Sequence, residues 1–409
     1  MPGKPLGVPV GSEAAGFSLP LSIGLAALSA AAMNLLLPVL PLLQESFDAS
    51  HGAVQTGLTS FLVGSAAAQL ALGPLSQHCG WRALLTPALL IFCSGSVLAA
   101  MAPSLEAHIA GRFLQGVGGA ASLVLAEALT ASVSRDAILV RRMGYLNAGM
   151  AAAILLAPVA GAVIGTAFGW RTICWAAFAA GIILLVLNWR GGKMPPEESS
   201  GPHAPAAPLL LSRRFVGHSL CAGFVMVNYF CLAAFGPSIG IGFLGLTYAE
   251  YGLVFALLGA AYIAGNLASS RVSRRYGQRR STAAALAVGI AAGGTAAALA
   301  WQGRLDIASF IAMGCVIGAV TGVVLPNASG AALDGQGMAL GAAAAVLNLA
   351  IFGIGALTTH VVGSHVDGMP LQALTILPVA TALALLAVLV AGGPPRPPHS
   401  SPASTGDTP

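Results

Sequence analysis

The sequence contains very few charged residues. Only 8% are Asp, Glu, Lys or Arg, whereas a typical soluble domain has about 25%. Hydrophobic residues make up 56% of the chain, and its mean hydropathy is +0.84. This composition excludes a soluble globular protein and predicts an all-α integral membrane protein.

Several chemical signatures are also missing. The six Cys residues include no CxxC pair, which argues against a disulfide framework and against a thiol metal site. The chain lacks the Gly-rich loop ending in Gly-Lys-Ser/Thr that binds ATP phosphates. It also lacks a cluster of catalytic residues or an appended domain, so we expect neither an enzyme nor a receptor, and no cofactor or metal.

Long apolar runs are abundant. Windows of about 20 residues are long enough to cross a hydrocarbon core of about 30 Å as helix. Twelve can be drawn, six on each side of the midpoint, at roughly 17–39, 53–75, 83–103, 107–130, 143–166, 168–189, 214–236, 250–270, 281–302, 306–327, 337–361 and 371–391. The first is too long for a signal-peptide core and is expected to be a retained helix.

An internal repeat divides these windows into two sets. A short turn at 73–82 interrupts two apolar runs, and its Gly80 and Arg82 recur 197 residues later as Gly277 and Arg279. We therefore expect two pseudo-symmetric six-helix halves. The expected divisions are a disordered tail (1–16), the first half (17–190), a flexible cytoplasmic linker (191–212), the second half (213–391) and a disordered tail (392–409).

Positive charge is distributed unevenly between the two ends of these windows. If the loops are assigned alternately to the two sides of the membrane, fifteen of the eighteen Lys and Arg residues fall on one side. Arg112, Arg171 and Arg304 fall elsewhere. Because positive charge near helix ends stays in the cytoplasm, both termini are expected to be cytoplasmic. The net charge of +5 is thus a topology signal and does not indicate nucleic-acid binding.

Ionisable side chains inside a span are costly and are more often functional than not. The fourth window contains Arg112, Gln115 and Glu127, and the first contains Asn34 at a similar depth to Arg112, so a hydrogen bond between those two is feasible. Arg112 and Glu127 face broadly the same way but are about 22 Å apart along the helix. The alternatives are that Arg112 snorkels to the outer interface and that Glu127 is a solvated helix-end carboxylate near Arg135.

The second half contains mid-span polar residues that could line a substrate cavity. They are Asn228, Tyr229, Tyr262 and Asn348, and Asn266 is a further polar residue at mid-span. Each could equally be a hydrogen-bonding contact between helices.

Taken together, the repeated loops and several short motifs resemble the major facilitator superfamily over residues 17–391. The motifs resemble its drug/proton antiporter branch, particularly the Bcr/CflA drug-resistance group. They are Leu37-Pro38-Val39-Leu40-Pro41, Gly73-Pro74-Leu75-Ser76, Arg112 to Gly118, Gly169-Trp170-Arg171 and Pro326-Asn327-Ala328.

The resemblance assigns roles to further residues and also exposes departures. Gly73, Gln77, Gly80, Arg82, Gly277 and Arg279 match the family's conformational-switch loops, and Gly144, Pro158 and Gly161 match its helix-five motif. The family usually has Asp at the positions of Gln77 and Asn34. Gln77 thereby weakens the charged latch of the loop, and Asn34 removes a titratable site from the first window. Glu127 is then the most obvious intramembrane carboxylate for proton coupling.

The resemblance implies a monomeric secondary transporter in the bacterial inner membrane. It would export drug-like or amphipathic small molecules in exchange for protons, with the proton gradient as its energy source. The alternatives are a dedicated exporter of one native metabolite, such as a siderophore, and, third, an uptake symporter. A membrane receptor or enzyme is the alternative of a different class.

The charge distribution yields a test of topology. We expect single cysteines placed in residues 195–210, in a background without the native cysteines, to be shielded from impermeant thiol reagents added outside intact cells. Labelling from outside would contradict a cytoplasmic linker.

Overall fold

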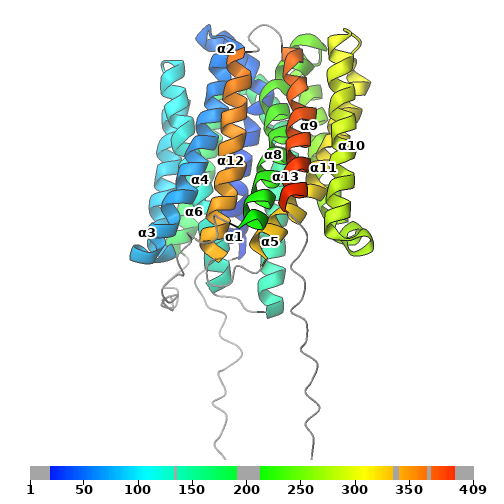
Figure 1. The fold of residues 1–409 in the computed structure, drawn as a ribbon. Helices are drawn as coiled ribbons and strands as arrows, with labels where there is room; N and C mark the ends of the chain where they lie inside the picture. The colour runs from blue at the N-terminus through cyan, green and yellow to red at the C-terminus, as the bar shows by residue number, and fades with distance from the viewer. Residues whose placement is uncertain (1–18, 133–135, 191–211, 335–339, 366–369, 392–409) are drawn as a thin grey trace, which may run out of the picture.

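The structure is a computed structural model that describes residues 19–132, 136–190, 212–334, 340–365 and 370–391. In this part of the chain all regular elements are helical, and Figure 1 shows the long helices standing side by side in one bundle. The elements are α1 (Leu19–Leu35), η1 (Leu37–Val39), α2 (Leu40–Phe47), α3 (His51–Ala100), α4 (Leu105–Ser132), α5 (Asp136–Phe168), α6 (Trp170–Arg190), α8 (Arg213–Pro237), η2 (Ser238–Phe243), α9 (Tyr248–Tyr276), α10 (Gln278–Trp301), α11 (Ile307–Leu333), α12 (Leu340–His365), η4 (Pro370–Thr375) and α13 (Ile376–Ala391).

Eleven of the twelve predicted spans correspond to helical stretches that are long and apolar enough to cross a membrane. The twelfth window, 53–75, forms the first part of α3. The predicted all-α membrane fold is therefore confirmed. The predicted linker, most of it within 191–211, and the predicted tails lie outside the described residues.

Helix α3 contains two antiparallel spans. Its first part runs parallel to α4, since Ser60 donates to the carbonyl of Ile109 and Ser65 to that of Gly116. Its last part runs antiparallel to α4, since Gln115 donates to Ser96 whereas His108, earlier in α4, contacts the carbonyl of Ala99. The chain direction therefore reverses within α3.

The predicted turn at 73–82 lies between these two parts of α3. The reversal of direction is as expected, but the chain is helical throughout 51–100, so the expected non-helical interruption is wrong. The helix thus extends to the reversal from both sides. In the second copy the helix does break, because Gly277 alone separates α9 from α10 and has φ 83°, a conformation that favours glycine.

The helix-five motif packs α5 against two neighbours. A Cβ atom at Gly161 would collide with the backbone of Leu35 in α1, which belongs to the same half. Near the same level, Gly252 of α9 in the other half lies against the carbonyl oxygen of Pro158 and against Ala162. The motif thus contacts the other half through Pro158 and Ala162, while Gly161 allows α1 to pack closely against α5.

Hydrogen bonds also join the two halves. The hydroxyls of Thr59 in α3 and Thr359 in α12 are 3.2 Å apart, and the Gln55 amide donates to the carbonyl of Ala234 in α8 at 2.8 Å. These contacts lie away from what we call the basic end, the end of the bundle where α8 begins and where α9 meets α10. The basic end carries Arg213, Arg214, Arg274, Arg275, Arg279 and Arg280.

Two glycines of α5 provide a matched test of this packing. Gly161→Ala should lower stability by about 1–3 kcal/mol because the new methyl group has no room against α1. Gly144→Ala should be neutral or stabilising by up to about 1 kcal/mol, since no heavy atom lies within 4 Å of its added Cβ and Ala favours helix. Thermal unfolding of the purified variants in detergent measures both, and equal effects would contradict the close α1–α5 contact.

Candidate functional site

Arg112 is held at the centre of a buried polar cluster in the first half. It is only 3% exposed, although it lies within the candidate span 105–130. Its Nη1 donates to the carbonyl oxygen of Ala32 in α1 at 3.1 Å and to Oε1 of Gln115, one helical turn away, at 2.7 Å. The guanidinium carbon lies 4.6 Å from the centre of the Phe61 ring. The alternative of snorkelling to the interface is therefore wrong.

The cluster continues through Gln115 into α3. The Gln115 amide donates to the Ser96 hydroxyl at 2.8 Å, and Ser96 donates to the carbonyl of Phe92 at 2.8 Å. Within the described residues the only ion pair is Arg214–Asp334, so Arg112 has no carboxylate partner there. Carbonyl and amide dipoles and an aromatic face therefore stabilise a full buried charge. Such a cation can attract the negative end of a substrate dipole or a substrate anion.

Asn34 connects the two halves near this cluster. It is 1% exposed, and its Nδ2 donates to the carbonyl of Ala30 at 2.7 Å. The hydroxyl of Tyr229 in α8 donates to Asn34 Oδ1 at 2.6 Å. Asn34 and Arg112 thus have different partners, and the hydrogen bond that we considered between them is not seen. Arg112 binds instead to the carbonyl of Ala32, two residues earlier.

The remaining polar residues of the second half have distinct environments. Asn228 is 1% exposed and donates to Thr381 in α13 at 2.9 Å, so it is a contact between helices of one half. Tyr229 and Tyr262 line a cavity of about 20 Å³ between α8, α9 and α11. Such a volume holds about one water molecule. Asn348 is half-buried in α12 and has no hydrogen-bond partner within the described part of the chain.

Glu127 lies apart from the Arg112 cluster, toward the other end of α4. Its side chain is exposed and makes no hydrogen bond or ion pair with the described residues. Arg135, the neighbour that we considered, lies outside them. A carboxylate in this position is accessible to water and could exchange protons with it.

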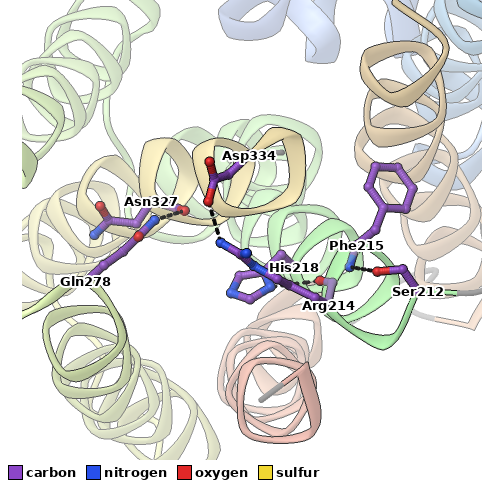
Figure 2. A network of polar contacts seen from close by, with 7 residues as sticks. All are labelled: Ser212, Arg214, Phe215, His218, Gln278, Asn327 and Asp334. Atoms are coloured by element: carbon purple, nitrogen blue, oxygen red, sulfur yellow. Dashed lines mark hydrogen bonds and ion pairs between the residues drawn. The ribbon is translucent and has the colours of Figure 1, made fainter. Parts of the chain in front are cut away.

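The second copy of the switch loop is fixed to α11. Figure 2 shows Gln278 reaching Asn327, where its amide donates to the backbone carbonyl at 2.6 Å. The hydroxyl of Ser273 donates to Asn327 Oδ1 at 3.0 Å. Arg279 is exposed, and its contact with the carbonyl of Leu389 is 3.4 Å long. In the first copy, Gly73, Gln77, Gly80 and Arg82 are within α3, but their side chains lie outside those that the structure describes.

The sequence did not indicate several residues of these networks. Ser96 and Phe61 complete the Arg112 cluster, and nothing in their local pattern marks them. Gln278 and Ser273 could have been noticed, because Ser273 is the repeat partner of Ser76. No group of three or more His, Cys, Asp or Glu side chains within the described ranges could hold a metal ion.

The described part of this chain is all helical and contains eleven apolar spans, a buried cation between helices and polar contacts across two halves. These are features of a multi-pass membrane transporter. The sequence model of the Major Facilitator Superfamily matches residues 23–354. The chain therefore belongs to the major facilitator superfamily, and it is a transporter rather than an enzyme.

Individual relatives agree with this assignment. The chain is 27% identical over 382 residues to the uncharacterized MFS-type transporter YdgK of Bacillus subtilis (strain 168), covering 90% of this chain and 93% of YdgK. It is 27% identical over 244 residues to the multidrug resistance protein MdtL of Escherichia coli (strain K12), covering 58% of this chain and 61% of MdtL.

Solved structures share the fold at low sequence identity. A D-xylose-proton symporter superimposes with a TM-score of 0.73 at 13% identity, covering 91% of this chain and 96% of that chain. A bacterial homologue of the human lysosomal transporter Spinster, in an inward-facing and unoccupied conformation, gives 0.68 at 14% identity, covering 93% and 96%.

The hydrogen bond between Tyr229 and Asn34 yields a testable prediction. Tyr229→Phe removes a hydrogen bond between the halves that is worth about 0.5–1.5 kcal/mol. The arrangement in which the two halves have moved apart at this contact should therefore become about 2–10-fold more populated. Distances between spin labels at Glu45 and Gly242, both near the end opposite the basic end, would report this shift.

A matched control removes a similar hydrogen bond within one half. Thr381→Val breaks the contact with Asn228, so it should lower thermal stability without changing the label distances. Unchanged distances in Tyr229→Phe would show that this hydrogen bond does not restrain the halves.

Proposed function

We propose that this transporter exports small drug-like or amphipathic organic compounds across the bacterial inner membrane in exchange for protons. It would act as a monomer by alternating access, without a cofactor and with the proton gradient as its energy source. Support for export comes from the similarity to MdtL, which is named a multidrug resistance protein, and from the motifs that resemble the Bcr/CflA group. The symporter among the solved structures bears on the fold alone.

The observation that carries proton coupling is the environment of Glu127. Three other carboxylates of the described spans lie near the opposite end, and two of them accept hydrogen bonds at the start of a helix. Glu106 accepts from Ser104 at the start of α4, and Glu250 forms a capping box with Thr247 at the start of α9. Glu127 has no such structural partner, is exposed, and is near the end of its span. A proton can therefore be exchanged there without dismantling a helix end.

Arg112 would have a different role. A guanidinium remains protonated in proteins, so Arg112 cannot carry the transported proton. Its buried charge faces broadly the same side of α4 as Glu127, about 22 Å away. It would attract a substrate dipole or anion, or stabilise one arrangement of the halves.

The arrangement of the two halves supports a state open toward the basic end. Thr59–Thr359 and Gln55–Ala234 join the halves toward the opposite end. With both termini in the cytoplasm, this would be an inward-open state.

Transport in liposomes tests the proposal. With ethidium as the probe, Glu127→Gln should reduce transport driven by a pH gradient at least about 10-fold, while exchange without a gradient continues, because the neutral amide cannot release a proton. Glu106→Gln on the same helix is the matched control and should leave both activities nearly unchanged.

Arg112→Ala in the same liposomes should lower transport under every gradient, since it removes the charge at the centre of the buried cluster. Full pH-driven exchange by Glu127→Gln would place the proton path elsewhere. Transport in the direction of the proton flux would indicate a symporter. Failure to transport any of several lipophilic cations would favour a dedicated exporter of one native metabolite, such as a siderophore.

A further inference from the structure

A cavity lies at the basic end of the second half, away from the Arg112 cluster. It has a volume of about 460 Å³ and lies where α8 and α10 begin and α11 and α13 end. Its lining includes Arg214, Arg279, Arg280, Gln278 and Asn327. The proposed transport function assigns it no role.

The charge of the cavity is strongly positive and mostly uncompensated. Arg214 forms an ion pair with Asp334 at 2.7 Å, as Figure 2 shows, and this pair neutralises one of the three arginines. Arg279 and Arg280 have no carboxylate partner within the described ranges. The long hydrogen bond from Arg279 to Leu389 compensates no charge. Two arginines without a carboxylate partner in the described ranges therefore line one space.

The backbone adds to this positive potential. Helix α10 begins at Gln278 without a side chain that caps its first turn, because its N-cap residue is Gly277. The free N–H groups of a helix N-terminus favour an anion. The Gln278 amide is not free, since it holds the carbonyl of Asn327, and this contact fixes the start of α10 beside α11. The two arginines that follow Gln278 are thus held beside α11.

We infer that this cavity binds a phosphate group. Arginine presents several N–H donors in a fork that matches phosphate oxygens, and two arginines beside a helix N-terminus are a suitable donor set for one. An anionic phospholipid headgroup and a soluble phosphate share this chemistry. This inference concerns binding alone and does not depend on the direction or coupling of transport.

The position of the cavity favours a lipid headgroup as the source of the phosphate. Five candidate spans begin or end around it, at Arg213, Tyr276, Gln278, Leu333 and Ala391. This is the level at which headgroups meet the ends of membrane helices, and basic pockets between helices at this level bind anionic headgroups. Tyr276 and Leu389, near its edge, are exposed apolar side chains that acyl chains would cover.

The test compares two charge-matched double variants of the full-length chain in detergent. Arg279→Gln/Arg280→Gln removes the two cavity arginines. Arg271→Gln/Arg274→Gln removes two exposed arginines of α9 that do not line the cavity, with the same change in net charge. The readout is the thermal unfolding temperature as a function of added short-chain phosphatidylglycerol, phosphatidylcholine or inorganic phosphate.

We expect phosphatidylglycerol to stabilise the wild type and the α9 variant at similar concentrations. The cavity variant should need about 30-fold more, given the usual contribution of two arginines at a membrane surface. Phosphatidylcholine, which has no net charge, should have little effect. Stabilisation by inorganic phosphate through the same two arginines would retain the site but identify a soluble source. No response of the wild type to either phosphate source, or equal responses of all three proteins, would overturn the inference.

Discussion

The hydrocarbon interior of a membrane offers no water, so a charge buried in this bundle depends on the protein for its hydrogen-bond partners. Arg112 illustrates the constraint most clearly, because it is a full charge with 3% exposure and no carboxylate partner among the described residues. Its hydrogen bonds go to the carbonyl of Ala32 and to Gln115, and Gln115 in turn requires Ser96. One charge therefore positions α1, α3 and α4 relative to one another.

The same constraint explains why small residues occur where helices meet. A carbonyl or amide can reach a neighbouring helix only if the two backbones approach closely, and glycine permits this approach. Ser65 reaches the carbonyl of Gly116, and a Cβ at Gly116 would collide with the backbone of Phe61. Close packing and polar satisfaction are thus achieved by the same residues.

Most of the fold could be predicted because apolar length and the distribution of Arg and Lys are encoded locally. The partners inside the spans could not. Asn34 and Tyr229 are 195 residues apart, and no local pattern indicates that they meet. The environment of Arg112 was also missed, since the carbonyl that binds it comes from α1. By contrast, Gly277 marked a turn correctly, because its positive φ is a local requirement. Sequence reasoning therefore found the elements and the candidate residues but not their pairings.

The contacts that join the halves are weak enough to be reversible. The cross-half hydrogen bonds of Gln55, Thr59 and Tyr229 are all between neutral groups, each worth about 0.5–1.5 kcal/mol. An alternating transporter requires two arrangements that differ by only a few kcal/mol, since otherwise a substrate or proton could not shift the balance between them. The buried charge of Arg112 is held within one half, so separating the halves at these contacts does not expose an unpaired ion. Strong polar binding thus stays inside each half, and the interface is left to contacts that a transport cycle can break.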